Sequence, residues 1–304
     1  MASTAEILET ILTKPPRAPH GIAYNYLVPN IRGLENLIKI FQAQNAQNPS
    51  GYPTPPPSPH PEQSQGRGPR TATPSSNLSQ KSSSEPAETL SANSTEVSLF
   101  AAATETFSQK NTNCSIAESM ERCKPIMELA KQHNIRVRGY VSVALGCPYE
   151  GPDVDPHKVA EITATLLEMG CDEVSVADTT GMGTAPRTRK LLQTLKEAGI
   201  LVEDLALHFH DTYGMALVNT VVGLEHGVRI FDSSVGGLGG CPYSKGATGN
   251  VATEDLLHLL HSLGCETGVD MVKMAEIGKW ITAELGRPND SRAGKATLAR
   301  LADS

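Results

Sequence analysis

The sequence predicts an α/β fold: an incomplete β/α barrel with six strands, where a closed barrel has eight. From about residue 96 onward, short β-branched or apolar runs alternate with longer amphipathic stretches. This alternation is typical of parallel strands joined by helices. Distinctive polar side chains recur where the predicted strands end, which is where barrels of this class carry their active sites. A chain of 304 residues has room for one such domain.

The elements after residue 96 are assigned from local composition and from helix-start signals. The predicted strands are Glu96 to Ala101, Arg136 to Val143, Glu173 to Ala177, Asp204 to His208 and Val228 to Asp232. The predicted helices are Ser115 to Gln132, Pro156 to Met169, Ala185 to Glu197 and Tyr213 to Glu225, with further helices starting at Thr253 and near Asp270. Asp155 followed by Pro156 supplies an N-cap and a proline in the first helical turn.

The first part of the chain contributes less to the predicted barrel. We expect a helix over Ala5 to Ile11, a strand over Tyr24 to Val28 and a helix over Gly33 to Gln44. Residues 48–94 are rich in Pro, Ser, Gln and Thr and poor in apolar residues, so they cannot bury enough surface to offset their ordering entropy. We expect this segment to be a disordered insertion; a Pro-rich recognition segment and a translated intron are the alternatives.

These assignments divide the chain into three predicted parts. Residues 1–47 form the N-terminal part of the barrel, residues 48–94 the disordered Pro/Ser-rich insertion, and residues 95–304 the main part of the catalytic barrel with C-terminal helices.

The amino-acid composition indicates which kinds of partner and which cell compartment to expect. The formal net charge is −7 and no block of Lys or Arg occurs, which argues against nucleic-acid and membrane-surface partners. The six cysteines form no CxxC pair, as expected in a reducing compartment. No apolar run approaches the roughly 18 residues that span a bilayer. The N-terminus shows no targeting signal, so the sequence as written predicts a soluble, cytoplasmic protein.

Two histidines at the end of a predicted strand form a candidate metal site. Side chains alternate along a strand, so His208 and His210 are expected on one face and Leu207 and Phe209 on the other. Asn250 closes a glycine-rich loop after the next strand and offers an amide oxygen. Two imidazoles with oxygen donors suit Mg²⁺, Mn²⁺ or Zn²⁺. The structural alternative is a polar strand end that binds nothing.

Three further residues are candidates for chemistry. Cys241 lies in a glycine-rich loop that could present its thiol to a substrate, which favours proton transfer over a buried structural cysteine. Cys147 follows a strand directly, and a structural role is equally expected. Asp178 ends a strand and is either a cap of the next helix or an acid/base or metal-supporting carboxylate.

Several motifs together resemble 3-hydroxy-3-methylglutaryl-CoA lyase, of the pyruvate carboxyltransferase-like TIM-barrel superfamily. They are Arg138-Gly-Tyr-Val-Ser142, Gly146-Cys-Pro-Tyr-Glu-Gly151, His208-Phe-His-Asp-Thr-Tyr-Gly214 and Gly237-Leu-Gly-Gly-Cys-Pro-Tyr243, with Gly249-Asn250. Isopropylmalate and homocitrate synthases of the wider superfamily share His-x-His but carry Asn-Asp after it and a Gly-Glu-Arg loop, and neither occurs here.

The resemblance implies a metal-dependent lyase that cleaves 3-hydroxy-3-methylglutaryl-CoA to acetyl-CoA and acetoacetate, in leucine catabolism and ketone-body formation. It implies a Mg²⁺ or Mn²⁺ ion on His208, His210 and Asn250, with Cys241 and Asp178 in catalytic roles. The implied partner is a small-molecule CoA thioester, and a homo-oligomer is compatible with the sequence. The family is usually mitochondrial.

The sequence departs from the family pattern at its start. The family's first strand ends in an Arg-Asp pair, and this sequence contains no such pair; Glu6 is the expected match to a glutamate that contacts that arginine. The chain is therefore expected to lack the first two strands. Since such groups contribute about 100- to 1000-fold each, we expect this polypeptide to be weakly active or inactive. The alternatives are a catalytically dead CoA-ester-binding or regulatory protein and a related aldolase or Claisen-type enzyme.

Overall fold

The computed structural model describes residues 6–7, 10–11, 22–47, 95–240 and 249–302. The chain divides into two compact units. The first unit consists of Met1–Tyr24 and Glu35–Thr95, and the second of Asn25–Leu34 and Glu96–Ser304. The predicted insertion at 48–94 and the candidate Cys241 lie outside the described residues, so both predictions stay predictions.

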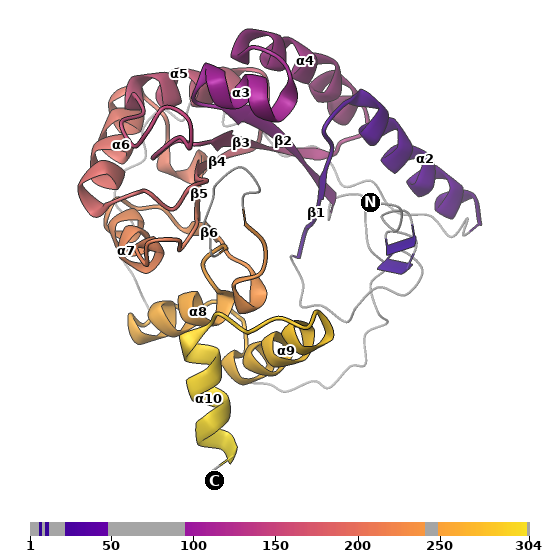
Figure 1. The fold of residues 1–304 in the computed structure, drawn as a ribbon. Helices are drawn as coiled ribbons and strands as arrows, with labels where there is room; N and C mark the ends of the chain where they lie inside the picture. Colours follow the sequence, from indigo (N-terminus) through magenta and orange to yellow (C-terminus); the bar gives the residue numbers. More distant parts are fainter. Residues whose placement is uncertain (1–5, 8–9, 12–21, 48–94, 241–248, 303–304) are drawn as a thin grey trace, which may run out of the picture. The chain divides into compact units, whose positions relative to one another are not determined.

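A six-stranded sheet forms the centre of the second unit, to which all its residues except Tyr24 and Thr95 belong. Its strands follow one another in chain order: β1 (Tyr24–Leu27), β2 (Thr95–Ala102), β3 (Arg136–Ser142), β4 (Glu173–Asp178), β5 (Leu205–Phe209) and β6 (Ile230–Asp232). The pairs from β2 to β6 are parallel. Figure 1 shows the strands curling around a common interior, which confirms the predicted incomplete barrel.

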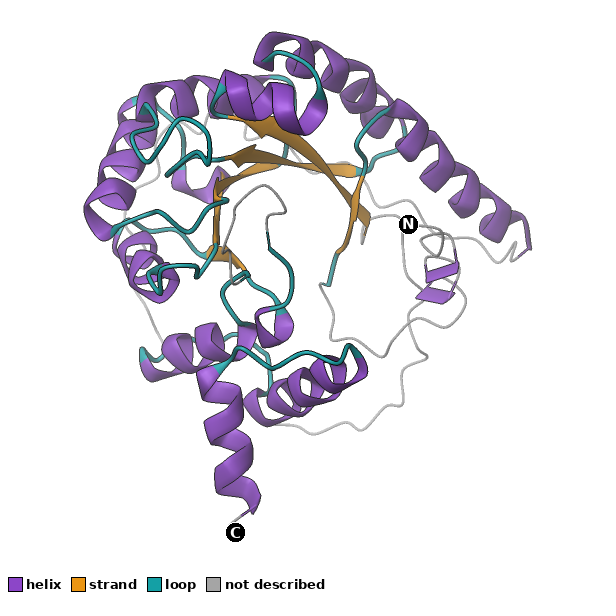
Figure 2. Ribbon diagram, viewed as in Figure 1, coloured by secondary structure: helices purple, strands orange, loops and turns teal. Residues whose placement is uncertain are grey.

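Helices α4 (Ile116–Gln132), α5 (Pro156–Glu168), α6 (Ala185–Glu197) and α7 (Ala216–Glu225) connect the strands from β2 to β6 and lie on the outer side of the curled sheet (Figure 2). The other described helices are α2 (Ile31–Gln47), α3 (Glu105–Thr112), α8 (Thr253–Ser262), α9 (Met271–Glu284) and α10 (Arg292–Ala302). The sequence did not predict α3 or α10. Among the described residues, no helix combines the length and apolar composition needed to cross a membrane.

Local side-chain caps mark the starts of α4, α5 and α9. The Asp155 side chain accepts a hydrogen bond from the His157 backbone N–H at 2.9 Å, with Pro156 in the first turn of α5, as predicted. Ser115 and Glu118 form a capping box at α4. The predicted start of α7 at Tyr213 was wrong, because Gly214 has a φ of +71° and Asp211 accepts the Ala216 N–H at 3.0 Å, so the helix begins at Ala216.

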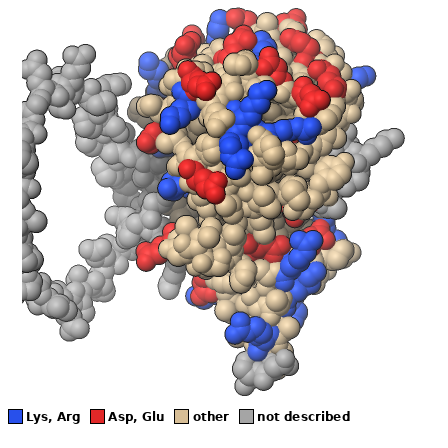
Figure 3. All heavy atoms as spheres, turned by 90° about the vertical axis from the view of Figure 1, so that its left-hand side faces the viewer, with Lys and Arg blue, Asp and Glu red and all other residues tan. Residues whose placement is uncertain are grey.

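The two faces of the sheet differ in chemistry. Val141, Val176 and Leu207 share one row across β3, β4 and β5 and are at most 2% exposed. The alternate rows carry polar side chains: Arg138 pairs with Glu173, and His208 pairs with Asp232. One face of the sheet therefore forms the apolar core and the other carries the candidate site. At the surface, Figure 3 shows basic side chains interspersed with acidic ones on one side of the molecule.

Candidate active site

His208 and His210 lie at the C-terminal end of β5. Their ring centroids are 5.3 Å apart, while the intervening Phe209 and the preceding Leu207 are each 2% exposed. Strand alternation therefore places the two imidazoles together and the two apolar side chains in the core, as predicted. The His208 side chain is 25% exposed.

Asn250 completes this pair from the far end of the glycine-rich loop. It forms an isolated antiparallel bridge with His210, and its Nδ2 donates to the Leu238 carbonyl at 2.9 Å. Two buried atoms, His210 Nδ1 and Asn250 Oδ1, have no hydrogen-bond partner among the described residues. Because buried polar atoms are normally paired, these two atoms fit a ligand such as a divalent cation.

The protonation state of His210 suits metal binding. Burial, followed by the neighbouring His208, lowers the pKa of His210 to about 4. The imidazole is therefore neutral at pH 7 and has a lone pair to donate. Among the described residues, no cluster of three or more His, Cys, Asp and Glu side chains could hold a metal ion. The donors found here are thus two imidazoles and one amide.

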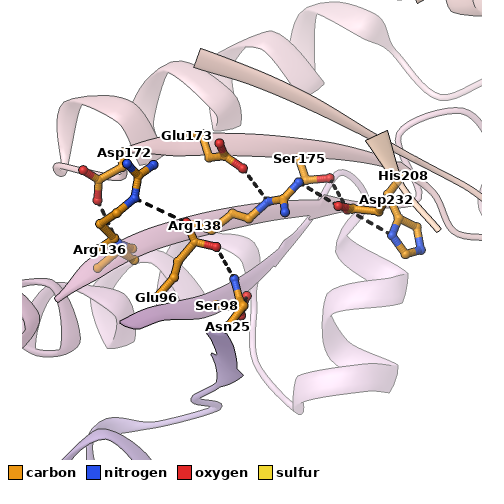
Figure 4. A network of polar contacts seen from close by, with 11 residues as sticks. Asn25, Glu96, Ser98, Arg136, Arg138, Asp172, Glu173, Ser175, His208 and Asp232 are labelled. Atoms are coloured by element: carbon orange, nitrogen blue, oxygen red, sulfur yellow. Dashed lines mark hydrogen bonds and ion pairs between the residues drawn. The ribbon is translucent and has the colours of Figure 1, made fainter. Parts of the chain in front are cut away.

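Asp232 is the residue of this site that the sequence analysis missed. It lies level with His208 on the neighbouring strand β6, and its Oδ2 is 3.2 Å from His208 Nδ1. The same oxygen accepts the Ser175 hydroxyl at 2.9 Å, and Oδ1 lies 2.8 Å from Arg138 Nη2 (Figure 4). Burial raises the pKa of Asp232, but the His208 hydrogen bond and the Arg138 charge outweigh it, so the pKa is lowered.

Arg138 connects the site to the sheet interior. Its Nε lies 2.7 Å from Glu173 Oε1, and its guanidinium lies 5.2 Å from the centre of the Tyr140 ring. Further along, Arg136 pairs with Glu96, which also accepts the Asn25 amide (Figure 4). The side chains in this network come from all six strands, β1 to β6, and His208 is in contact with one of its members, Asp232.

Asp178 occupies a different environment from the histidines. It is in register with Phe209, is 1% exposed, and its Oδ2 accepts the Gly183 N–H at 2.9 Å. Burial raises the pKa of Asp178 to about 6. It does not cap α6, whose N-cap is Thr184. The carboxylate instead holds the loop between β4 and α6, and its catalytic role stays a prediction.

Similarity to known proteins shows the family of this chain. The HMGL-like family model matches residues 72–281, more than half of the chain. The chain belongs to the HMGL-like family. The 3-hydroxy-3-isohexenylglutaryl-CoA/hydroxy-methylglutaryl-CoA lyase of Pseudomonas aeruginosa is 57% identical over 205 residues, which cover 67% of this chain and 68% of that protein.

The names of other HMGL-like relatives state the cell compartment of the enzyme. The mitochondrial hydroxymethylglutaryl-CoA lyase of rat is 52% identical over 69% of this chain and 64% of its own length. The cytoplasmic 3-hydroxy-3-methylglutaryl-CoA lyase of Danio rerio is 50% identical over 68% and 62%. The chain thus spans slightly less than two thirds of these vertebrate relatives and slightly more than two thirds of the bacterial one.

Solved structures of HMGL-like enzymes share the fold. The hydroxymethylglutaryl-CoA lyase of Pseudomonas aeruginosa aligns with a TM-score of 0.76 and 43% identity, covering 99% of this chain and 80% of that chain. An HMG-CoA lyase from Acinetobacter baumannii, described as a complex with coenzyme A and 3-methylmalate, aligns with a TM-score of 0.72 and 26% identity, covering 97% and 77%.

Three candidate residues of the sequence analysis remain: Cys147, Glu6 and Cys241. Cys147 is fully buried, with its Sγ 3.2 Å from the Thr104 hydroxyl, which favours the structural reading. Glu6 is an exposed residue of the first unit, so its proposed contact with an arginine of the HMGL-like site stays a prediction. Cys241 lies outside the described residues, as noted above.

A cavity adjoins Asn250 in the second unit. It has a volume of about 450 Å³ and is lined by Asp211, Tyr213, Gly237 and Arg292, among others. The Tyr213 side chain is exposed at its edge. A space of this size beside the candidate ligands can take a small organic molecule.

Proposed function

We propose that the chain is a divalent-metal-dependent carbon–carbon lyase that cleaves 3-hydroxy-3-methylglutaryl-CoA to acetyl-CoA and acetoacetate. One observation carries this proposal. In a chain of the HMGL-like family, two imidazoles lie together at the C-terminal edge of a parallel sheet, and the residue bridged to His210 is Asn250, whose buried amide oxygen has no hydrogen-bond partner among the described residues. Parallel barrels perform their chemistry at this edge.

His208, His210 and Asn250 would hold Mg²⁺ or Mn²⁺. When bound, the ion would supply a Lewis acid to the substrate hydroxyl and to a neighbouring carbonyl or carboxylate oxygen. The bond between C2 and C3 breaks as a general base takes the hydroxyl proton and the hydroxyl oxygen becomes the ketone of acetoacetate. The acetyl-CoA enolate then accepts a proton, which we assign to the Cys241 thiol. Asp178, with its pKa raised to about 6 by burial, is the second candidate for proton transfer.

The proposed partner is a CoA thioester. The A. baumannii relative has been crystallised with coenzyme A, and the cavity beside Asn250 gives part of such a molecule a place to lie. The relatives' names include both mitochondrial and cytoplasmic enzymes. A role in leucine catabolism and ketone-body formation favours the mitochondrion, and microscopy of the tagged protein in its own cells would test this.

The test is acetoacetate formation from 3-hydroxy-3-methylglutaryl-CoA by the purified protein, with Mn²⁺ and with a chelator. We expect metal-dependent cleavage that His208→Asn lowers by at least about 100-fold, as for loss of a group that stabilises the transition state. His258→Asn is the matched control, because His258 is exposed on α8 and is expected to leave cleavage unchanged. In a polypeptide of these 304 residues, which contains no Arg-Asp pair, we expect slow turnover.

Two other outcomes favour the alternatives. Calorimetric binding of acetyl-CoA with no cleavage above the chelated background would favour a CoA-ester-binding or regulatory protein. Condensation of acetyl-CoA with an oxo acid would favour a related aldolase or Claisen-type enzyme. Cleavage that persists unchanged in the chelator would contradict the metal-dependent function.

A further inference from the structure

The Asp232 carboxylate lies among three side chains from three other strands. His208 Nδ1 on β5 is 3.2 Å from Oδ2, the Ser175 hydroxyl on β4 is 2.9 Å from the same oxygen, and Arg138 Nη2 on β3 is 2.8 Å from Oδ1. The Asp232 side chain is 16% exposed. A carboxylate held at both oxygens cannot rotate without losing a partner.

We propose that Asp232 is a positioning residue for the metal site: it fixes the ring orientation and the tautomer of His208, so that the Nε2 lone pair is presented to the ion. Arg138 and Ser175 hold Asp232 in place for this purpose. The proposal rests on the metal-dependent function proposed above.

The physical reason is the single proton of a neutral imidazole. A carboxylate accepts hydrogen bonds and cannot donate them, so a neutral His208 facing Asp232 carries its proton on Nδ1. Nε2 is then unprotonated and free to bind a cation. Carboxylates that accept from the far nitrogen of a metal-binding histidine fix its tautomer and raise its basicity. Nothing in the local sequence shows this pairing, because His208 and Asp232 are 24 residues apart.

Asp232→Asn gives a sharp test because the neighbours of Asp232 are donors. Arg138 can only donate, so the amide oxygen of the new side chain should face Arg138 and its NH₂ group should face His208. The His208 Nδ1 atom must then accept, and the proton moves to Nε2, where it blocks the metal. Glu173→Gln is the matched control. Glu173 is the other carboxylate beside Arg138, and the structure gives it no hydrogen bond or ion pair with His208 among the described residues.

The first measurement is the tautomer of His208 by ¹⁵N NMR in the metal-free protein. The His208 signals are identified by their loss in His208→Asn. We expect the Nδ1–H form in the wild type and in Glu173→Gln, and the Nε2–H form in Asp232→Asn. An Nε2–H form in the wild type, or the same tautomer in the wild type and Asp232→Asn, would overturn the proposal.

The second measurement is Mn²⁺ affinity, from titration of the purified proteins without substrate. We expect Asp232→Asn to bind Mn²⁺ about 10- to 100-fold more weakly, as for other partners of metal-bound histidines, and Glu173→Gln to bind it as the wild type does. An equal loss in both variants would mean that Asp232 acts only through stability. A wild-type protein with the Nδ1–H tautomer but no Mn²⁺ binding would contradict the proposed function, and with it the role of Asp232 toward a metal.

Discussion

At the residue scale, the site depends on which neighbours each titratable group has. His210 and Asp178 are both buried at the ends of adjacent strands, and burial shifts the pKa of each toward its neutral form, to about 4 and about 6 respectively. For His210 the neutral form is the one that binds a metal. For Asp178 it means that the carboxylate is costly to ionise and changes charge within the range of pH at which enzymes work.

The raised pKa of Asp178 can be tested by comparing the pH dependence of stability in the wild type and in Asp178→Asn. The folded pKa of Asp178, about 6, lies above the ordinary aspartate value of 3.8, so the ionised carboxylate destabilises the folded state above pH 6, and this cost disappears as the pH falls through 6 toward 3.8. Relative to Asp178→Asn, the unfolding free energy of the wild type should increase by up to about 3 kcal/mol as the pH falls from 7.5 to 4. Urea unfolding of both proteins at these pH values measures the difference. A constant difference would show that the pKa of Asp178 is not raised.

At the scale of single elements, loops and helix ends are set by contacts that differ in range. A local contact sets the start of α5, since Asp155 caps the helix that follows it directly. The start of α10 is not set locally: Asp255 on α8 accepts the backbone N–H groups of Arg292 and Ala293 at 3.2 and 2.6 Å and the Ser291 hydroxyl at 2.7 Å. A cap supplied from about 37 residues away has no signature in the local sequence, which explains why α10 was not predicted.

The loop between β4 and α6 offers a prediction at this scale. A Cβ atom on Gly183 would lie 2.6 Å from Asp178 Oδ2 and 2.9 Å from Leu145 Cδ1. Gly183→Ala should therefore displace the Asp178 carboxylate and destabilise the protein by about 1–3 kcal/mol, as overpacking does. Lyase turnover should fall with it if Asp178 transfers a proton. Chemical denaturation and the acetoacetate assay measure the two effects.

Gly33→Ala in α2 is the matched control for Gly183→Ala. The nearest atom to its Cβ would be Pro29 Cδ at 3.5 Å, an ordinary contact. Alanine in a helix is favoured over glycine, so this variant should be neutral or more stable by up to about 1 kcal/mol. Equal losses in the two variants would show that the crowding at Gly183 is not the cause.

At the scale of the whole molecule, the polar face of the curled sheet is held by a charged network in the second unit. Arg138 is the centre of this network, between Glu173 and Asp232, and its side chain is 11% exposed. Removal of one partner from a buried ion pair typically costs about 3–5 kcal/mol, because the remaining charge is left uncompensated. The same network positions His208, so stability and the candidate metal site are linked.

Arg138→Met should therefore destabilise the protein by about 3–5 kcal/mol at pH 7. Burial already raises the pKa of Glu173 in the folded state, and without Arg138 it should rise further; the pKa of Asp232, which is lowered in the wild type, should rise as well. The destabilisation by the two uncompensated carboxylates is therefore present at neutral pH and is lost as they become protonated on acidification. The difference in unfolding free energy between Arg138→Met and the wild type should shrink toward pH 4. Unfolding curves across this range measure it.

Arg136→Met is the comparison variant for Arg138→Met. Arg136 is 49% exposed and makes a long contact, from its Nε to Glu96 at 3.5 Å, while the Glu96 side chain is 10% exposed and also accepts the Asn25 amide, so the loss of Arg136 should cost less than the loss of Arg138. A loss as large as that of Arg138→Met would contradict the assignment of the network's stability to its buried members.

Local periodicity and motifs in the sequence were enough to predict the six strands and their order, most of the helices, and the placement of His208 and His210 on one face of a strand. The motifs also indicated the HMGL-like family. The three-dimensional structure was needed to find that Asp232 and Arg138 support His208, that Asp178 faces the Gly183 loop, and that Asp255 caps α10. The physical reason is that alternation and capping act between residues a few positions apart, whereas the partners of a buried charge are chosen by strand register across the sheet.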